Sequence, residues 1–248
     1  TELQERSNKL RKKAERYIES LSDDRDFRDY EETLSKINKS CAKMVKWVEQ
    51  EILEIIDSGK NPVLVGGDHS TPLGFIKALS QRYQEFGILQ IDAHADLRDS
   101  YEGFTYSHAS IMFNALKIDA VRKLVQVGIR DYCRAEADLI SANPERIHCF
   151  YDRDIKADQF MGKNWGTICE SIIEKLPQKV YLSFDIDGLD PKLCPNTGTP
   201  VAGGFETEQI LFLLEKVVAS GREIIGFDLN EVAPGKDEWD ANVAARLL

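Results

Sequence analysis

Asp92, His94 and Asp96 stand at alternate positions directly after an apolar run at residues 87–91. In an extended backbone, alternate side chains point to the same side. Two carboxylates and an imidazole that share one side suit a hard or borderline divalent cation. The sequence therefore predicts a metal site here, to which other segments must add ligands.

Polar side chains also follow three further apolar runs. They are Asp68 and His69 after residues 63–65, Asp185, Asp187 and Asp190 after residues 180–184, and Asp228, Asn230 and Glu231 after residues 224–227. Each of these could cap a helix or form a turn, and we interpret Asp68 and Asp190 in that way. Uncompensated carboxylates that gather on one rim repel one another, and bound metal removes that cost.

The predicted ligand set has six members: His69, Asp92, His94, Asp96, Asp185 and Asp187. Four carboxylates and two imidazoles are too many for one ion that must also bind water, so they suit two ions with bridging carboxylates. Mixed oxygen and nitrogen ligation without thiolates favours manganese over structural zinc. Two ions about 3.5–4 Å apart can form a hydroxide near neutral pH.

The elements that would position these residues alternate along the chain. Residues 1–58 have a helical pattern with a break around residues 22–26. Strand-like runs follow at residues 63–65, 87–91, 124–127, 147–150, 180–184 and 224–229, and helical patterns at residues 72–83, 165–176 and 207–219 separate most of them. This alternation predicts one α/β domain with a mostly parallel sheet, helices on both faces and ligands at the carboxyl ends of the strands.

The composition excludes several classes of partner. The chain has 248 residues and a net charge of -10, which argues against nucleic acid and anionic membranes. No apolar run approaches the roughly 20 residues of a membrane-spanning helix. The five cysteines are odd in number and form no CxxC pair, so we expect reduced thiols and a cytoplasmic protein.

Five motifs together resemble the ureohydrolase family of arginases and agmatinases. They are GGDHS (residues 66–70), DAHAD (92–96), SFDIDGLDP (183–191), TGTPVAGG (197–204) and EVAP (231–234). The resemblance spans residues 61–248 in order and implies a three-layer α/β/α sandwich, a binuclear manganese centre and a homo-oligomer, either a trimer or a hexamer. Family members begin with a strand and a Gly-rich loop, so we expect residues 1–248 to be a single ureohydrolase domain without that N-terminal strand and loop.

The resemblance also implies a role for each matching residue. His69, Asp92, Asp96 and Asp185 would bind one manganese ion, and Asp92, His94, Asp185 and Asp187 the other, with Asp92 and Asp185 as bridges. Asp96 would orient the bridging hydroxide that attacks the guanidinium carbon. Glu231 would bind the substrate guanidinium through a bidentate carboxylate pair. His108 would protonate the leaving amine, so urea and a primary amine would result.

Two positions indicate which substrate the protein binds. Arginases hold the α-carboxylate with an Asn where this chain has Arg98, and the α-amino group with an Asp where it has Cys133. LRDSYEG (residues 97–103) and YSHAS (106–110) instead look like the corresponding loop of agmatinases. We therefore expect a small cationic guanidino substrate, agmatine, which would give putrescine for polyamine biosynthesis; guanidinobutyrate, aminopropyl-agmatine, arginine and formiminoglutamate are the alternatives.

Two other classes compete with this interpretation. A deacetylase-like amidohydrolase of the same fold would keep one zinc ion, whereas His69, Asp96 and Asp187 together favour two metals. A metal-binding pseudoenzyme would not need Glu231 and His108. The number of ions bound per chain distinguishes the deacetylase-like enzyme from a binuclear ureohydrolase, and a urea-release assay distinguishes the pseudoenzyme from an active one.

Overall fold

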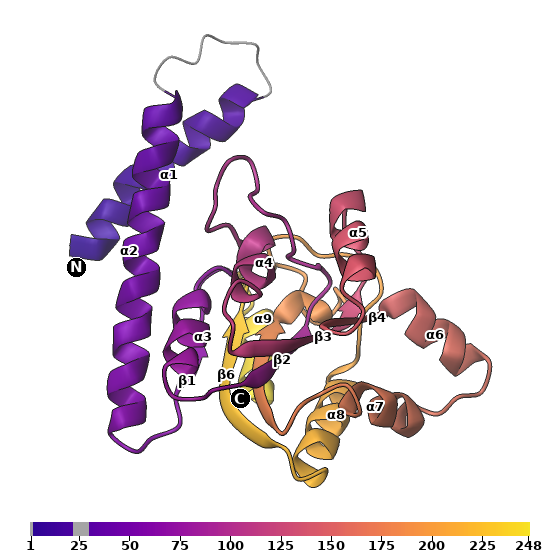
Figure 1. The fold of residues 1–248 in the computed structure, drawn as a ribbon. Coiled ribbons are helices and arrows are strands. Elements are labelled where there is room, and N and C mark those ends of the chain that lie inside the picture. The colour runs from indigo at the N-terminus through magenta and orange to yellow at the C-terminus, as the bar shows by residue number, and fades with distance from the viewer. Residues whose placement is uncertain (1, 22–29) are drawn as a thin grey trace.

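A computed structural model describes residues 2–21 and 30–248 of the protein. Its first two helices, α1 (Glu2–Leu21) and α2 (Tyr30–Asp57), lie along one side of the molecule (Figure 1). Val45, Val48 and Ile52 repeat at helical spacing and are buried, so this face of α2 packs on the rest of the chain. The predicted helical start is confirmed, and the predicted break lies outside the described residues.

Six parallel strands form one sheet in the order β1-β6-β5-β2-β3-β4. They are β1 (Val63–Val65), β2 (Phe86–Ile91), β3 (Val121–Ile129), β4 (Ile147–Tyr151), β5 (Lys179–Asp185) and β6 (Glu223–Asn230). Every residue of β2 is buried, because helices cover both faces of a parallel sheet. All six predicted runs are strands.

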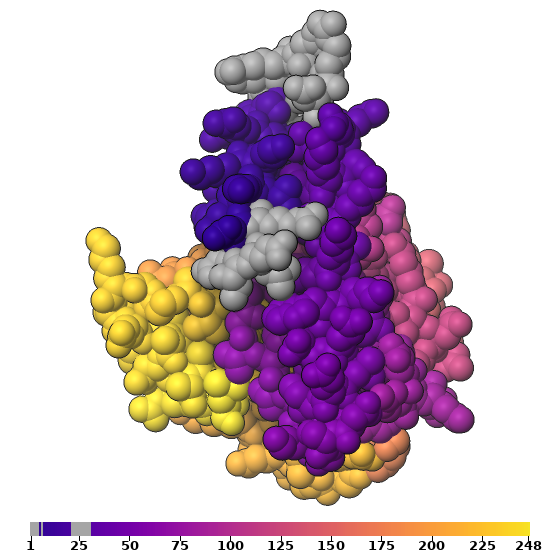
Figure 2. All heavy atoms as spheres, turned by 90° about the vertical axis from the view of Figure 1, so that its left-hand side faces the viewer, coloured from indigo at the N-terminus to yellow at the C-terminus, as the bar shows by residue number. Residues whose placement is uncertain are grey.

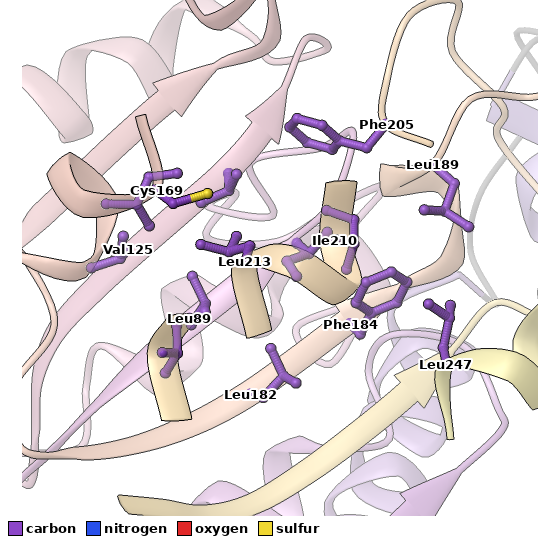
Figure 3. Close-up of a cluster of buried hydrophobic side chains, with 14 of the residues drawn as sticks. Leu89, Val125, Cys169, Leu182, Phe184, Leu189, Phe205, Ile210, Leu213 and Leu247 are labelled. Carbon is purple, nitrogen blue, oxygen red and sulfur yellow. The ribbon is translucent and has the colours of Figure 1, made fainter. Parts of the chain in front are cut away.

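Helices pack on both faces of this sheet. One core joins it to α2, α3 (Leu73–Ser80), α4 (Ile111–Ala115) and α5 (Arg134–Ala142). The other joins it to α6 (Asp152–Phe160), α7 (Trp165–Ile173), α8 (Thr207–Ala219) and α9 (Trp239–Leu247). Figure 3 shows this second core, in which Ile210 and Leu213 of α8 face Leu182 and Phe184 of β5. The predicted three-layer α/β/α sandwich is confirmed.

Two helices end several residues before the last residue that their sequence patterns predict. The pattern at residues 72–83 gives α3, which ends at Ser80, and the pattern at residues 165–176 gives α7, which ends at Ile173. In both cases the next amides bond to carbonyls three residues back, as Arg82 N does to Leu79 O, so the last turn is tightened. None of the helices in the described part of the chain has the length and apolarity to span a bilayer.

The space-filling view in Figure 2 shows that α2 covers one side of the molecule from end to end. The segments that follow β1, β2, β5 and β6 leave the sheet at the carboxyl edge, because all four strands run parallel. The segment between β2 and the short 3₁₀ helix η1 (His108–Ser110) rises towards the α1–α2 pair (Figure 1). This edge therefore holds the predicted site residues.

Candidate metal centre and adjoining pocket

A first ligand group surrounds the imidazole of His69. Its Nδ1 atom lies 3.0 Å from Asp92 Oδ2, 3.0 Å from Asp96 Oδ2 and 3.5 Å from Asp185 Oδ2. All four side chains are buried. The structure thus brings together four predicted ligands from three strand ends.

A second ligand group surrounds His94. Its Nδ1 atom lies 3.1 Å from Asp187 Oδ2 and 3.5 Å from Asp92 Oδ1. Asp92 therefore presents one carboxylate oxygen to each histidine, which is the arrangement that a bridging carboxylate requires. Potential ligand atoms of His69, Asp92 and Asp185, and of Asp92, His94 and Asp187, lie within 4.8 Å of one another in each set.

The turn after β5 carries two of these carboxylates. Asp185 Oδ1 accepts a hydrogen bond from Asp187 N at 3.0 Å and so caps the 3₁₀ helix η2 (Ile186–Gly188). Asp187 Oδ1 accepts from Ala93 N at 3.0 Å, which ties this turn to the end of β2. Gly188 allows the approach, because a Cβ atom there would lie 2.9 Å from Asp92 N. The same aspartates serve as turn formers and as potential ligands.

The hydrogen bonds of His69 test whether a cation fits here. Ser183 Oγ donates to Asp228 Oδ1 at 3.2 Å and lies 2.9 Å from His69 Nε2, so it accepts the Nε2 proton. In the neutral form that ligation requires, the lone pair of Nδ1 is therefore aimed at three carboxylates, and this buried Nδ1 has no hydrogen-bond partner among the described residues. A lone pair that faces carboxylates needs a positive charge between them, so the residues fit a metal ion.

The pKa values of the cluster lead to the same requirement. Burial and the charge of Asp92 raise the pKa of Asp96 to about 7, and burial raises the pKa of Asp185 well above its usual value. Burial alone would lower the pKa of His94, but its hydrogen bonds to Asp187 and Asp92 raise it to about 11. The side chains by themselves retain protons, which are the positive charges that a cation would replace.

Two members of the rim have left-handed backbones, Asp96 with φ 54° and Glu231 with φ 60°. The carbonyl of Asp96 accepts from Met112 N and Phe113 N, which fastens it to α4. Glu231 Oε1 accepts from His69 N at 2.9 Å. Such strained conformations persist where the surroundings hold them, and they concentrate at functional sites.

A pocket of about 140 Å³ opens beside the second ligand group. Its lining comprises His94, Asp96, Arg98, Tyr101, His108, Ala109, Asp131, Tyr132, Glu136 and Thr199. The His108 ring is edge-on to the Tyr101 ring at 6.0 Å between centroids, and the Arg98 guanidinium lies 5.1 Å from the centroid of Tyr101. The pocket thus joins two predicted ligands, His94 and Asp96, to the histidine that was predicted to transfer a proton.

The family model described as "Arginase family" matches residues 1–248. The chain belongs to the arginase family. The similarity in sequence extends to curated members of several substrate classes. The chain is 35% identical over 201 residues to an N(1)-aminopropylagmatine ureohydrolase of Thermus thermophilus, covering 81% of this chain and 64% of that protein. It is 34% identical to a guanidinobutyrase of Pseudomonas aeruginosa (78% and 59% covered) and 31% identical to an agmatinase of Bacillus subtilis (81% and 66%).

Solved structures of the arginase family have the same fold. The chain superposes on the agmatine ureohydrolase of Thermoplasma volcanium with a TM-score of 0.70 and 27% identity, covering 84% of this chain and 66% of that one. The arginase of Medicago truncatula gives a TM-score of 0.70 and 28% identity, with 83% and 63% covered. The chain spans about three-fifths of the length of the first curated relatives that it matches.

Glu231, the residue expected to bind the guanidinium in this arginase-family chain, does not line the pocket itself. Glu231 lies behind the pocket, against the backbone of His69, and burial raises the pKa of Glu231. The charge of His108 acts in the opposite direction on the pKa of Glu231, so the two side chains lie within electrostatic reach.

Sequence reasoning missed the side chains that support the arginase-family ligands. Gln90 Nε2 donates to Asp92 Oδ2 at 2.8 Å, and Gln126 Nε2 donates to Gln90 Oε1 at 2.7 Å, both in the buried sheet. Glu136 accepts from Leu97 N and caps α5. Buried glutamines inside apolar runs were the available signal for the first two, because such side chains must find partners.

Proposed function

We propose that this protein hydrolyses a linear guanidine to urea and an amine at a binuclear metal centre, with His69, Asp92, His94, Asp96, Asp185 and Asp187 as ligands. The observation that supports it most is Asp92, whose two carboxylate oxygens face two separate histidines. A second observation is the pocket beside them, which contains His108. Family membership supplies the reaction class.

The chain's own residues would then divide the reaction between them. Two divalent cations, which we propose to be manganese, supply a hydroxide near neutral pH when they are bound. Asp96 accepts a hydrogen bond from the nucleophile and so orients it towards the guanidinium carbon. Glu231 pairs with the guanidinium through Oε2, since its Oε1 accepts from His69 N. His108 donates a proton to the leaving nitrogen as the C–N bond breaks, so that an amine departs and urea remains.

Agmatine is the substrate that we propose. The Arg98 side chain stacks on Tyr101, and its Nε atom lies 3.9 Å from Glu136 Oε2, so its charge is largely offset within the wall. Asp131, whose side chain is 65% exposed, lines the same pocket and supplies a carboxylate for the distal ammonium of a cationic substrate. Relatives named for agmatine, aminopropylagmatine and guanidinobutyrate make these the substrates to compare.

A urea-release assay tests the proposal. The protein is loaded with manganese and supplied in parallel with agmatine, aminopropylagmatine, guanidinobutyrate and arginine. We expect agmatine to give the highest kcat/KM. Turnover of guanidinobutyrate alone would overturn the substrate assignment, and the release of no urea from any guanidine would overturn the reaction class. Binding of only one ion per chain at saturation would favour the mononuclear amidohydrolase alternative.

We also propose that residues 1–248 act as one ureohydrolase domain in a cytoplasmic homo-oligomer, a trimer or a hexamer. Family resemblance supports the assembly, and five unpaired cysteines support a reducing compartment. Light scattering on the purified protein measures the assembly, and a monomeric mass would contradict it.

A further inference from the structure

The N-terminal helix pair contacts the segment that carries part of the pocket wall. We infer that Tyr17 of α1 and Asn38 of α2 are positioning residues that hold the turn at residues 101–104, and through it place the Tyr101 ring against His108. The inference rests on the proposed function for its kinetic readout, while its structural readouts need no turnover.

The turn has a geometry that needs support. Tyr101 N donates to Phe104 O at 3.3 Å, and Phe104 N donates to Tyr101 O at 2.8 Å, which closes a two-residue hairpin. Its central residues both have positive φ, 51° at Glu102 and 80° at Gly103, as a type I′ turn requires. A glutamate rarely adopts that conformation, so the turn benefits from contacts outside itself.

Both helices supply such contacts. The hydroxyl of Tyr17 donates to Glu102 O at 2.7 Å. Asn38 makes two bonds at once, since its Nδ2 donates to Gly103 O and its Oδ1 accepts from Thr105 N, each at 3.1 Å. Three backbone groups at residues 102–105 are therefore bonded to side chains that lie 65 to 85 residues away in the chain.

The burial of Tyr17 shows that α1 is packed where it contacts the turn. Among the side chains of α1 that the structure describes, Tyr17 is the buried one, at 6% exposure. Its ring is edge-on to the ring of Phe104 at 5.3 Å between centroids. The helix thus places its one buried aromatic ring on the turn.

The turn transmits its position to the pocket through one ring. Tyr101 lies edge-on to His108 and beneath the guanidinium of Arg98, and all three side chains line the pocket. A displacement of the turn would shift the Tyr101 ring away from both. Tyr17 and Asn38 therefore act on substrate binding and on the proton donor through Tyr101, without touching the substrate.

Two variants of the 248-residue chain test this inference. Tyr17→Phe removes one hydroxyl and keeps the ring on Phe104, and Asn38→Ala removes both of its bonds. Lys36→Ala is the matched control on α2, because Lys36 pairs with Glu32 on the exposed surface. The readouts are hydrogen exchange of peptides that cover residues 101–108, the imidazole proton NMR signal of His108 in the metal-free protein, because paramagnetic manganese would broaden it, and kcat/KM for agmatine in the manganese-loaded protein. His108 is one of only four histidines in the sequence.

We expect faster exchange at residues 101–105 and a shifted His108 signal in both variants, with metal content unchanged. The loss of kcat/KM should be roughly five- to tenfold in Tyr17→Phe, which removes one hydrogen bond, and larger in Asn38→Ala, which removes two, since each hydrogen bond contributes about that factor. The control should match the wild type. An unshifted His108 signal would overturn the inference, as would unaltered exchange. If Asn38→Ala does not fold, Tyr17→Phe decides. A wild type that releases no urea refutes the proposed function, while hydrogen exchange and NMR still decide whether Tyr17 and Asn38 hold the turn at residues 101–104.

Discussion

The Ser183 hydroxyl, which accepts a hydrogen bond from His69, offers the most direct test of the metal centre. Ser183 is fully buried and accepts the Nε2 proton of His69 at 2.9 Å, which keeps the Nδ1 lone pair free for a cation. In Ser183→Ala this acceptor is lost, and the Nε2–H of a residue with 1% exposure has no partner. The imidazole then favours the neutral tautomer that carries its proton on Nδ1.

The magnitude follows from the burial. An unsatisfied buried donor costs about 1–3 kcal/mol, and changes in the partners of metal-bound histidines typically weaken metal binding about 10–100-fold. Because Ser183 does not contact His94, we expect the loss at one of two manganese ions only. Isothermal titration of the metal-free variant with manganese should show one affinity lowered by this factor and one retained.

The control is Ser171→Ala on the exposed face of α7, where the hydroxyl bonds only to the helix carbonyl of Thr167. It should titrate like the wild type. If Ser183→Ala also kept both affinities, Nδ1 of His69 would not depend on the Ser183 contact, and the tautomer argument would be wrong. An equal loss at both ions would mean that the substitution disrupts the sheet edge as a whole, which circular dichroism and thermal unfolding would reveal.

Three further predictions concern the same edge of the sheet. His108→Asn should lower kcat for urea release by about 10²–10⁴-fold while atomic absorption finds the manganese content unchanged; equal losses of both would make His108 a ligand. Asp92→Asn should reduce the bound manganese to one ion or fewer per chain, because both ligand groups share that carboxylate, and two retained ions would contradict the bridge. Manganese affinity should rise with pH between about 6 and 7.5, by about tenfold per unit for each proton displaced, because the pKa of Asp96 is raised to about 7 from its usual 3.8. The pKa of Asp96 is higher in the folded protein than in the unfolded chain, so its proton stabilises the metal-free protein below pH 3.8, and this contribution is lost as the pH rises through 7. A manganese affinity that does not change with pH would refute the linkage between this proton and the metal.

Much of the site was predictable because the residues that do chemistry follow the strands. Each strand was visible as an apolar run, and parallel strands bring their carboxyl ends to one edge. His69, Asp92 and Asp185 meet there as predicted. The expected turn roles of Asp68 and Asp190 also hold, since their carboxylates accept from Ser70 N and Lys192 N.

The prediction that an extended backbone places Asp92, His94 and Asp96 on one side is only partly right. The strand ends at Ile91, and Asp96 has a left-handed backbone, so the three side chains do not line one side of an extended segment. Asp96 joins the group of His69, whereas His94 forms a second group. The alternate spacing of Asp92, His94 and Asp96 correctly predicted that the three side chains lie close together. The turn that they form, which depends on contacts with α4 and η2, determines which ion each side chain would bind.

The pocket wall was beyond sequence reasoning for a different reason. Tyr17 and Asn38 reach the turn at residues 101–104 only because α1 and α2 fold back along the side of the sheet. The helical spacing of Leu10, Ala14 and Tyr17 marks Tyr17 as part of the apolar face of α1, but it does not specify which segment this face contacts, and no such pattern distinguishes Asn38. Contacts between a helix and a distant loop depend on tertiary placement, which spacing within one segment does not specify.

Charge balance favours two cations over one at this edge. Asp92, Asp96, Asp185 and Asp187 are all at most 4% exposed, so their charges cannot be left to water. Two divalent ions neutralise four carboxylates and leave both imidazoles neutral, as ligation requires. One divalent ion would leave two negative charges that only protons could offset, and a proton on His94 or His69 would remove a ligand. The count of buried aspartates is therefore itself an argument for the binuclear centre, independent of family membership.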